Sequence, residues 1–287
     1  MLADAVVPDK TCVCTGIRWC AVCRDPALRR ATGMFPPREL PACEVHDFDL
    51  ESQRVPTAPD FTGVCVLRDA VDEASAAALL ARIEQTPWRP AQSGKRKQHF
   101  GPKVSFKHRR LRLAGFEGLP DYIRGIESLA RESFAVAAGF ETTDAFVLRY
   151  EPERQSNLDL HADDTFAYGE VILDLSLESD AALTFVPGTS IDDLERAKRR
   201  IRVPLPARSL LVLFGAARYR WLHGILPGDI TARRTSITLR TLSDELMETD
   251  VGRSVRAVAA TSLRTRSPHG GGNASDAGRA SGSRPTP

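Results

Sequence analysis

The feature that most constrains the fold is a series of eight short, strand-like segments between residues 146 and 242. In segments such as 158–163 and 235–242, apolar and polar residues alternate, and a period of two places successive side chains on opposite faces of a β-strand. The segments span residues 146–150, 158–163, 170–177, 182–186, 202–205, 209–214, 218–225 and 235–242. Such a series of short strands predicts a jelly-roll-like double-stranded β-helix, a mostly β fold (α+β) with flanking helices.

Two of these strands carry candidate metal ligands. His161 and Asp163 lie two positions apart and therefore share a face, whereas Asp164 points away. A metal needs a third ligand, and His223 is the best candidate. Two histidines and one carboxylate form the facial triad that leaves positions open on non-haem Fe(II). The short His-x-Asp motif also occurs by chance, and a lone strand histidine is often a core or surface residue.

A third strand adds two cations to the same region. Arg234 and Arg240 lie six positions apart on one face of a strand. Burying two guanidinium groups without acidic partners is costly, and an arginine binds a carboxylate through two parallel hydrogen bonds. The pair therefore indicates a diacid co-substrate such as 2-oxoglutarate.

These motifs, taken in order, resemble the AlkB family of Fe(II)/2-oxoglutarate-dependent dioxygenases. Further runs, at residues 92–104, 204–213 and 215–218, resemble the homologue 4 branch of that family, as does the cysteine pattern near the N-terminus. The resemblance covers roughly residues 10 to 245. It implies that the double-stranded β-helix carries a substrate lid, with the first helices packed against one of its faces.

The resemblance also implies roles for single residues. His161, Asp163 and His223 would hold the iron, Arg234 would pair with the distal carboxylate of 2-oxoglutarate, and Arg240 would contact its other end or the substrate. Tyr150 stands where family members hydrogen-bond the co-substrate. Their partner asparagine, two positions earlier, is Leu148 in this chain.

The reaction that the resemblance implies is oxidative removal of N-methyl groups. Monomethyl-lysine on actin is the first candidate substrate and N6-methyladenine in DNA is the second. An intracellular location is expected, because residues 1–10 contain acids and no long apolar stretch. The expected compartments are cytoplasm and nucleus.

A basic stretch at residues 95–112 contains eight lysines and arginines and no acid. It resembles the substrate lid of AlkB enzymes, expected here at about residues 91–118. By alternation, we expect Arg96, Gln98 and Phe100 to face the substrate, whereas Lys95 and Lys97 face water; Lys103 is a further lid residue. Basic and aromatic residues together suit a nucleic acid, an acidic protein surface or a plain solvated hairpin.

Four cysteines near the N-terminus have the spacing C-x-C-x5-C-x2-C. Cys12, Cys14, Cys20 and Cys23 suit tetrahedral Zn(II), with disulfides or free thiols as alternatives. Cys43 and Cys65 are interpreted as ordinary thiols.

Composition divides the rest of the chain. Residues 24–60 are rich in prolines and charges and are interpreted mostly as a connecting segment before a catalytic domain at 61–250. Helices are expected from Asp72 to before Pro87, at about 120–138 and, on the surface, at 191–200. Residues 251–287 carry six arginines and one aspartate and are expected to be a disordered tail, which leaves the body slightly acidic.

Two other classes remain open on the residues alone. One is a non-catalytic interaction module that uses the cysteines and the basic stretch. The other is a Zn(II)-dependent hydrolase or cupin-like binder that uses the same three ligands. Turnover that requires O2 and 2-oxoglutarate would exclude both.

Overall fold

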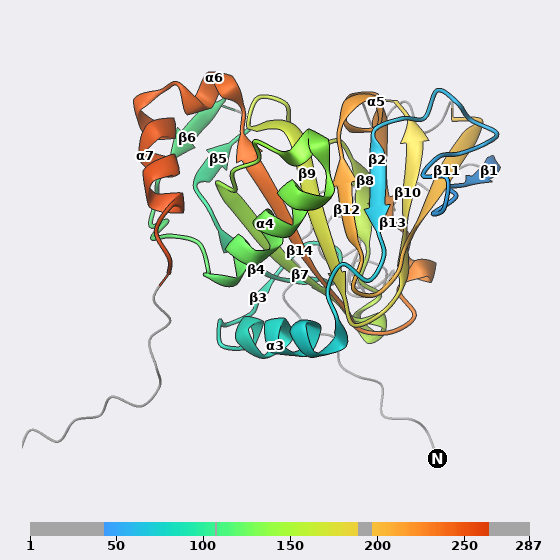
Figure 1. Ribbon diagram of the computed structural model, residues 1–287, viewed down its shortest axis with the longest axis horizontal. Helices are drawn as coiled ribbons and strands as arrows, with labels where there is room; N and C mark the ends of the chain where they lie inside the picture. Colours follow the sequence, from blue (N-terminus) through green and yellow to red (C-terminus); the bar gives the residue numbers. More distant parts are fainter. Residues whose placement is uncertain (1–42, 107, 189–196, 264–287) are drawn as a thin grey trace, which may run out of the picture.

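The computed structural model describes residues 43–106, 108–188 and 197–263, and its centre is a pair of facing β-sheets (Figure 1). The five-stranded sheet has the order β1 (Glu44–Asp47), β11 (Arg199–Leu205), β10 (Ala181–Pro187), β13 (Trp221–Ile225) and β8 (Leu158–His161). The seven-stranded sheet has the order β2 (Val64–Leu67), β12 (Leu210–Leu213), β9 (Tyr168–Leu177), β14 (Arg234–Leu242), β7 (Asp144–Tyr150), β4 (Arg96–Phe100) and β3 (Arg89–Pro90). A separate hairpin joins β5 (Lys103–Ser105) to β6 (Arg110–Arg112). This is the predicted double-stranded β-helix.

The two faces of the seven-stranded sheet pack against different partners. On β7, Ala145 and Val147 belong to a core shared with the helices, whereas Tyr150 belongs to the core between the sheets. The alternation along the strand thus produces two buried layers from one strand. The main helices on the outer face are α3 (Glu73–Ile83), α4 (Tyr122–Ser133) and α7 (Asp250–Ala259) (Figure 1).

Helix positions follow the capping signals. Asp72 accepts a hydrogen bond from the backbone N–H of Ser75 and begins α3, as predicted. The helix predicted over 120–138 is divided into α4 and the 3-10 turn η1 (Ala135–Ala137). The other short elements are η2 (Pro152–Arg154), α5 (Gly215–Tyr219), η4 (Pro227–Asp229) and α6 (Asp244–Met247). No helix in the described ranges has the length and apolarity needed to cross a membrane.

Three predicted strands are shorter than expected, and one of them, β12, loses only one residue at each end. β8 ends at His161, so Asp163 lies in the following loop. The strand expected from residue 218 begins at Trp221, because the preceding residues form α5. The helix predicted at 191–200 lies outside the described residues up to 196, and beyond them Arg199 begins β11.

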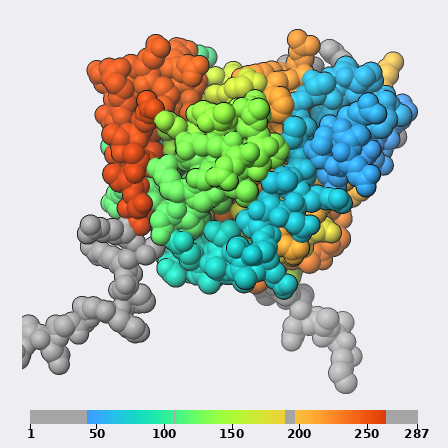
Figure 2. Space-filling view, viewed as in Figure 1, coloured from blue at the N-terminus to red at the C-terminus, as the bar shows by residue number. Residues whose placement is uncertain are grey.

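The interpretation of residues up to 60 as a connecting segment is wrong for residues 44–60. β1 pairs in parallel with β11, and Phe48, Val55 and Ala58 are buried in the core between the sheets. Figure 2 shows this blue segment packed against the rest of the molecule. The prolines and charges lie between these buried positions. The average composition of the segment is therefore polar, although the segment is packed. The four cysteines of the predicted zinc site lie outside the described residues.

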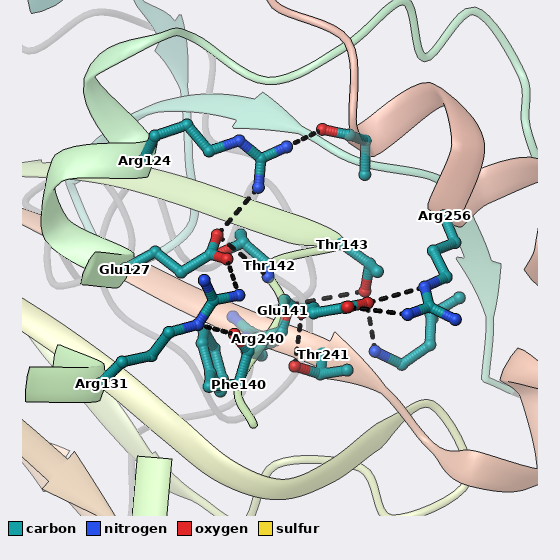
Figure 3. Close-up of polar contacts among 12 residues, drawn as sticks. Arg124, Glu127, Arg131, Phe140, Glu141, Thr142, Thr143, Arg240, Thr241 and Arg256 are labelled. Atoms are coloured by element: carbon teal, nitrogen blue, oxygen red, sulfur yellow. Dashed lines mark hydrogen bonds and ion pairs between the residues drawn. The ribbon is translucent and has the colours of Figure 1, made fainter. Parts of the chain in front are cut away.

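The disorder predicted from residue 251 is wrong for α7. Thr249 caps this helix by accepting from the N–H of Gly252, and Val255 and Ala259 are buried. Figure 3 shows how polar contacts attach α7 to the domain: both Nε and Nη2 of Arg256 donate to Glu141 at 2.7 Å, and Arg124 of α4 donates to the carbonyl of Ala259. Arg124 also donates to the buried Glu127. The apolar face of α7 and these ionic contacts hold the helix on the domain, although the average composition of the segment is polar.

Candidate metal centre

Three metal-ligating side chains converge at the end of the five-stranded sheet. His161 is the last residue of β8 and lies directly opposite His223 of β13 in the antiparallel register. Asp163 follows two positions after His161. One ligand atom from each residue lies within 4.8 Å of the others, and Nε2 of His223 is 3.4 Å from Oδ2 of Asp163. Among the described residues this is the one group of His, Cys, Asp and Glu that could hold a metal ion.

The imidazole of His161 is held in a form that can bind a metal. Nδ1 of His161 lies 2.8 Å from the carbonyl oxygen of Asp159, so Nδ1 donates its proton and Nε2 keeps a free lone pair. Burial, reinforced by the neighbouring His223, lowers the pKa of His161 to about 4. The ring is therefore neutral at neutral pH, the state that ligation requires.

Asp163 is kept ionised by its neighbours. Burial alone would raise the pKa of this carboxyl, but the charge of Arg240 and the hydrogen bond with His223 hold it well below its usual range. Nη1 of Arg240 lies 3.2 Å from Oδ1 of Asp163. The backbone is fixed as well, because Nη1 of the fully buried Arg218 donates to the carbonyl of Asp163 at 2.6 Å.

The two predicted arginines do lie on the site face of β14, and each has an acidic partner. Nη2 of Arg234 donates to Oδ2 of Asp174 at 3.0 Å and to Oγ of Ser176 at 2.7 Å. Nε and Nη1 of Arg234 are buried and have no hydrogen-bond acceptor in the described part of the chain. Arg240 contacts the metal ligand Asp163 directly. Arg234 thus has two buried donors left for a second carboxylate, whereas Arg240 has one, its Nε.

A cavity of about 70 Å³ joins these groups. It is lined by the three candidate ligands, both arginines, Tyr150, Asp174 and the apolar side chains of Leu148, Leu158, Ile172, Leu183, Leu205, Leu211, Leu213 and Ile225, with Thr238. Tyr150 is buried, which raises the pKa of its hydroxyl, and its ring lies 5.2 Å from the guanidinium carbon of Arg234. The cavity is therefore apolar along its walls and cationic at one end.

These residues fit an iron ion and a diacid. Two histidine imidazoles and one carboxylate are the facial donor set of non-haem Fe(II). The unpaired, buried N–H groups of Arg234 need an acceptor, since leaving them unsatisfied costs on the order of 1–3 kcal/mol, and a carboxylate supplies one. The apolar walls suit the methylene groups of a short dicarboxylate. That Tyr150 hydrogen-bonds this co-substrate stays a prediction, and Leu148 in place of the asparagine leaves that part of the cavity apolar.

The predicted orientation of the lid residues is wrong on β4. In the register with β7, Gln98 lies opposite Val147 and Phe100 opposite Ala145, so both share the outer face with the helices. The amide of Gln98 donates to the carbonyls of Ile83 and Thr86, and Phe100 is part of the helix-side core.

The remaining lid residues follow from the same register. Arg96 lies opposite Arg149 on the outer face, and its Nε is 3.1 Å from Glu151. Lys95 was expected to face water but is buried, and its ammonium donates to the carbonyl of Asn157. Lys103 of β5 is exposed. Alternation was correct, but it cannot say which of the two faces looks toward the site.

Sequence reasoning missed several residues of the site. Asp174 interrupts the apolar run from Ile172 to Leu175, and such a lone acid in a buried strand was a usable signal. Arg218 had no assigned role, although it fixes the loop that carries Asp163. Phe146 and Tyr168, whose rings lie 5.1 and 4.4 Å from the guanidinium carbon of Arg240, carried no sequence signal.

The fold and the ligand set together define a non-haem iron dioxygenase, and comparisons with known proteins agree. The model of the 2OG-Fe(II) oxygenase superfamily matches residues 63–240. The human alpha-ketoglutarate-dependent dioxygenase alkB homolog 4 is 34% identical over 284 residues, which cover 85% of this chain and 90% of the human protein. The mouse protein of the same name is 32% identical, covering 82% and 88%.

The chain therefore belongs to the AlkB family of the 2OG-Fe(II) oxygenase superfamily. It is also similar to a DNA N6-methyl adenine demethylase of Caenorhabditis elegans, at 27% identity over 66% of this chain and 63% of that protein. A solved structure described as that of OsALKBH1 aligns with a TM-score of 0.47 and 13% identity, over 63% of this chain and 97% of the other.

The enzyme is a dioxygenase that uses Fe(II) and 2-oxoglutarate. When bound, the metal and co-substrate supply the oxygen-activating chemistry. His161, Asp163 and His223 would supply three ligands for the metal, and Arg234 would pair with the distal carboxylate of the co-substrate. The apolar walls exclude water, and Arg240 keeps Asp163 ionised.

Proposed function

We propose that this chain is an oxidative demethylase whose substrate is a protein carrying monomethyl-lysine, with actin as the first candidate. The supporting observation is a wall beside the metal centre that suits a small alkylammonium group. It consists of the rings of Phe146 and Tyr168 and the carboxylate of Asp144. Aromatic faces attract cations, and a buried carboxylate favours a positively charged partner.

The geometry of this wall places it next to the triad. Asp144 lies opposite Arg240 in the register of β7 and β14, and Arg240 contacts Asp163. Asp144 is 1% exposed; its Oδ1 lies 2.6 Å from Nε2 of His99, and its Oδ2 has no hydrogen-bond partner among the described residues. The rings of Phe146 and Tyr168 already contact the guanidinium of Arg240, and Phe146 also stacks on the ring of His99. A methylated ammonium would add a second cation to this wall and use the unpaired oxygen.

N6-methyladenine in DNA is the second candidate substrate. The printed activity of the Caenorhabditis elegans relative supports it, as does the excess of basic residues at 95–112. Basic side chains supply the non-specific part of affinity for DNA. The location expected from the sequence, in cytoplasm and nucleus, likewise stays a prediction.

The test offers both substrates to the same enzyme preparation. Purified protein with Fe(II), 2-oxoglutarate and air receives either a monomethyl-lysine peptide of actin or an N6-methyladenine oligonucleotide, and formaldehyde is measured. We expect formaldehyde from the peptide, and we expect Asp144→Asn to lower this yield at least tenfold while leaving the substrate-free conversion of 2-oxoglutarate to succinate unchanged. Formaldehyde from the oligonucleotide alone would overturn the protein substrate in favour of DNA.

A further inference from the structure

The outer edge of the seven-stranded sheet is left open along half of its last long strand. β3 pairs with β4 at two register positions, Arg89 with Lys97 and Pro90 with Arg96. Within the described ranges, no strand continues this pairing along residues 98–100. An exposed strand edge is a template for pairing with another chain.

The backbone of His99 points toward this open edge. The N–H of Ala91 donates to the carbonyl of Lys95 at 2.8 Å, which continues the ladder between β3 and β4. In an antiparallel ladder alternate residues direct their N–H and C=O to the same side, so Lys97 and His99 face the edge on which Lys95 is paired. Lys97 meets Arg89, whereas His99 lies beyond the end of β3.

A groove of about 510 Å³ lies against this edge. Its lining includes residues 86, 87, 89, 97–101 and 114–118, and its size is within the range of about 300–1,000 Å³ typical of ligand sites. A Cβ at Gly115 would meet no atom within 4 Å, so this wall leaves room for an incoming chain. At Gly101 a Cβ would lie 2.2 Å from Oδ1 of Asp144, so the glycine lets the strand pass close to the pair of His99 and Asp144.

The charge of the groove selects its occupant. Arg89, Lys97 and Lys103 line it together with a single acid, Glu117. A polyanion is therefore favoured, and both an acidic polypeptide and a single-stranded nucleic acid satisfy that condition. The backbone N–H and C=O of His99, which lie beyond the end of β3, favour the peptide over the nucleic acid. An extended peptide pairs with such groups along a strand edge, and a nucleic acid does not.

We infer that the outer edge of β4 is an exosite that binds an extended acidic segment of a protein substrate by strand addition. This inference rests on the proposal that the substrate is a protein. Neighbouring strands lie about 4.8 Å apart, so a segment added beyond β4 would lie roughly 15 Å from β14. The docked segment is therefore not the methylated residue itself; it holds the protein while another part of it reaches the metal centre.

The experiment measures binding without any demethylation. The full chain, free of iron, is mixed with a synthetic twelve-residue peptide of alternating valine and glutamate, which contains no lysine. Affinity is measured by fluorescence anisotropy, and amide hydrogen exchange is followed by mass spectrometry and NMR. We expect the peptide to bind and to slow exchange at the His99 amide, and we expect the same peptide with proline at every second position to lose binding.

Matched variants locate the contact. Arg89→Glu and Lys103→Glu, both at exposed positions in the groove, should each weaken peptide binding at least tenfold. Lys198→Glu makes the same charge change at an exposed position outside the groove and should leave binding unchanged. Thermal unfolding of all three variants should match the parent chain, since none of these side chains is buried.

Three results would overturn the exosite. The first is unchanged exchange at His99 in the presence of millimolar peptide. The second is equal protection by single-stranded DNA, which would make the groove a nucleic-acid site. The third is protection that depends on the concentration of the protein alone, which would assign the edge to a second copy of this chain. The formaldehyde assay is independent of all three, so failure of the exosite and failure of the proposed reaction are separately visible.

Discussion

Polar and apolar side chains alternate both along β14, which lines the cavity between the sheets, and along β4, which has the open edge. The two strands differ in which set of residues faces the site. On β14, the alternating polar residues face the cavity, and each arginine there has an acid from a neighbouring strand or loop. On β4, Gln98 and Phe100 face the helices, and the opposite set, Lys97 and His99, lies on the site face. A period of two in the sequence tells which residues share a face of the strand. The pairing with neighbouring strands decides whether that face points toward the site or toward the helices.

The strongest loss is expected for iron binding in the cavity between the sheets. Asp163→Ala removes one ligand and leaves Arg240 without its acid, so iron affinity should fall by more than about 100-fold, since changes behind the ligands alone cost about 10–100-fold. Iron per chain, measured by elemental analysis, checks this. Asp164→Ala is the matched control, because Asp164 accepts from the N–H of Ala167 and should leave iron content unchanged. Equal iron loss in both variants would contradict the assigned ligand.

The next prediction concerns the side chain of Phe100 on β4, which packs against the helices and not toward the site. Phe100→Ala should lower the free energy of unfolding by about 3–5 kcal/mol, because Phe100 is part of the helix-side core. The same change at Phe106, which is 51% exposed, should stay within about 0.5 kcal/mol. Denaturant unfolding measures both. If Phe100→Ala instead changed the substrate KM with stability intact, the residue would face the substrate after all.

A smaller effect concerns the diacid end of the cavity. Arg234→Ala should raise the KM for 2-oxoglutarate about 10- to 150-fold, the equivalent of losing a charge-assisted pair worth roughly 1.5–3 kcal/mol. Its neighbour Arg233 is exposed and paired with Glu178, so Arg233→Ala should leave that KM unchanged. An unchanged KM in Arg234→Ala would place the distal carboxylate elsewhere.

A further effect is a pH dependence of the stability of the metal-free protein. The pKa of His161 is about 4 in the fold and near 6.5 in an unfolded chain. Between these values the unfolded state binds a proton that the folded state does not, so stability falls as pH decreases from 6.5 to 4. The slope from this one group is on the order of 1 kcal/mol per pH unit. His161→Gln should flatten the slope, and an identical slope in that variant would assign the effect to other groups.

These contrasts also show how far the sequence could be read. His161, Asp163, His223, Arg234 and Arg240 were identified because their chemistry and their spacing on strands agree, and the structure brings them together. The roles of Asp174 and Arg218 depend on contacts across the fold, with partners 60 and 55 positions away along the chain, which no local pattern encodes.

The ends of the domain were misread for a different reason. Residues 44–60 and helix α7 have a polar average composition, but a few apolar positions, such as Phe48 and Val55 in the first and Val255 in the second, are fully packed. Burial is decided by single positions, whereas a compositional reading averages over all of them. The zinc site predicted at the N-terminal cysteines lies outside the described residues and stays a prediction.

Succinate formation without a methylated substrate decides whether the cavity between the sheets is the iron and 2-oxoglutarate site. Succinate is measured after purified protein is incubated with Fe(II), 2-oxoglutarate and air but no methylated substrate, with Asp163→Ala in parallel. We expect slow, iron-dependent succinate formation by the parent chain and none above background by the variant. Iron-loaded parent protein that forms no succinate, or equal succinate from both proteins, would contradict the account.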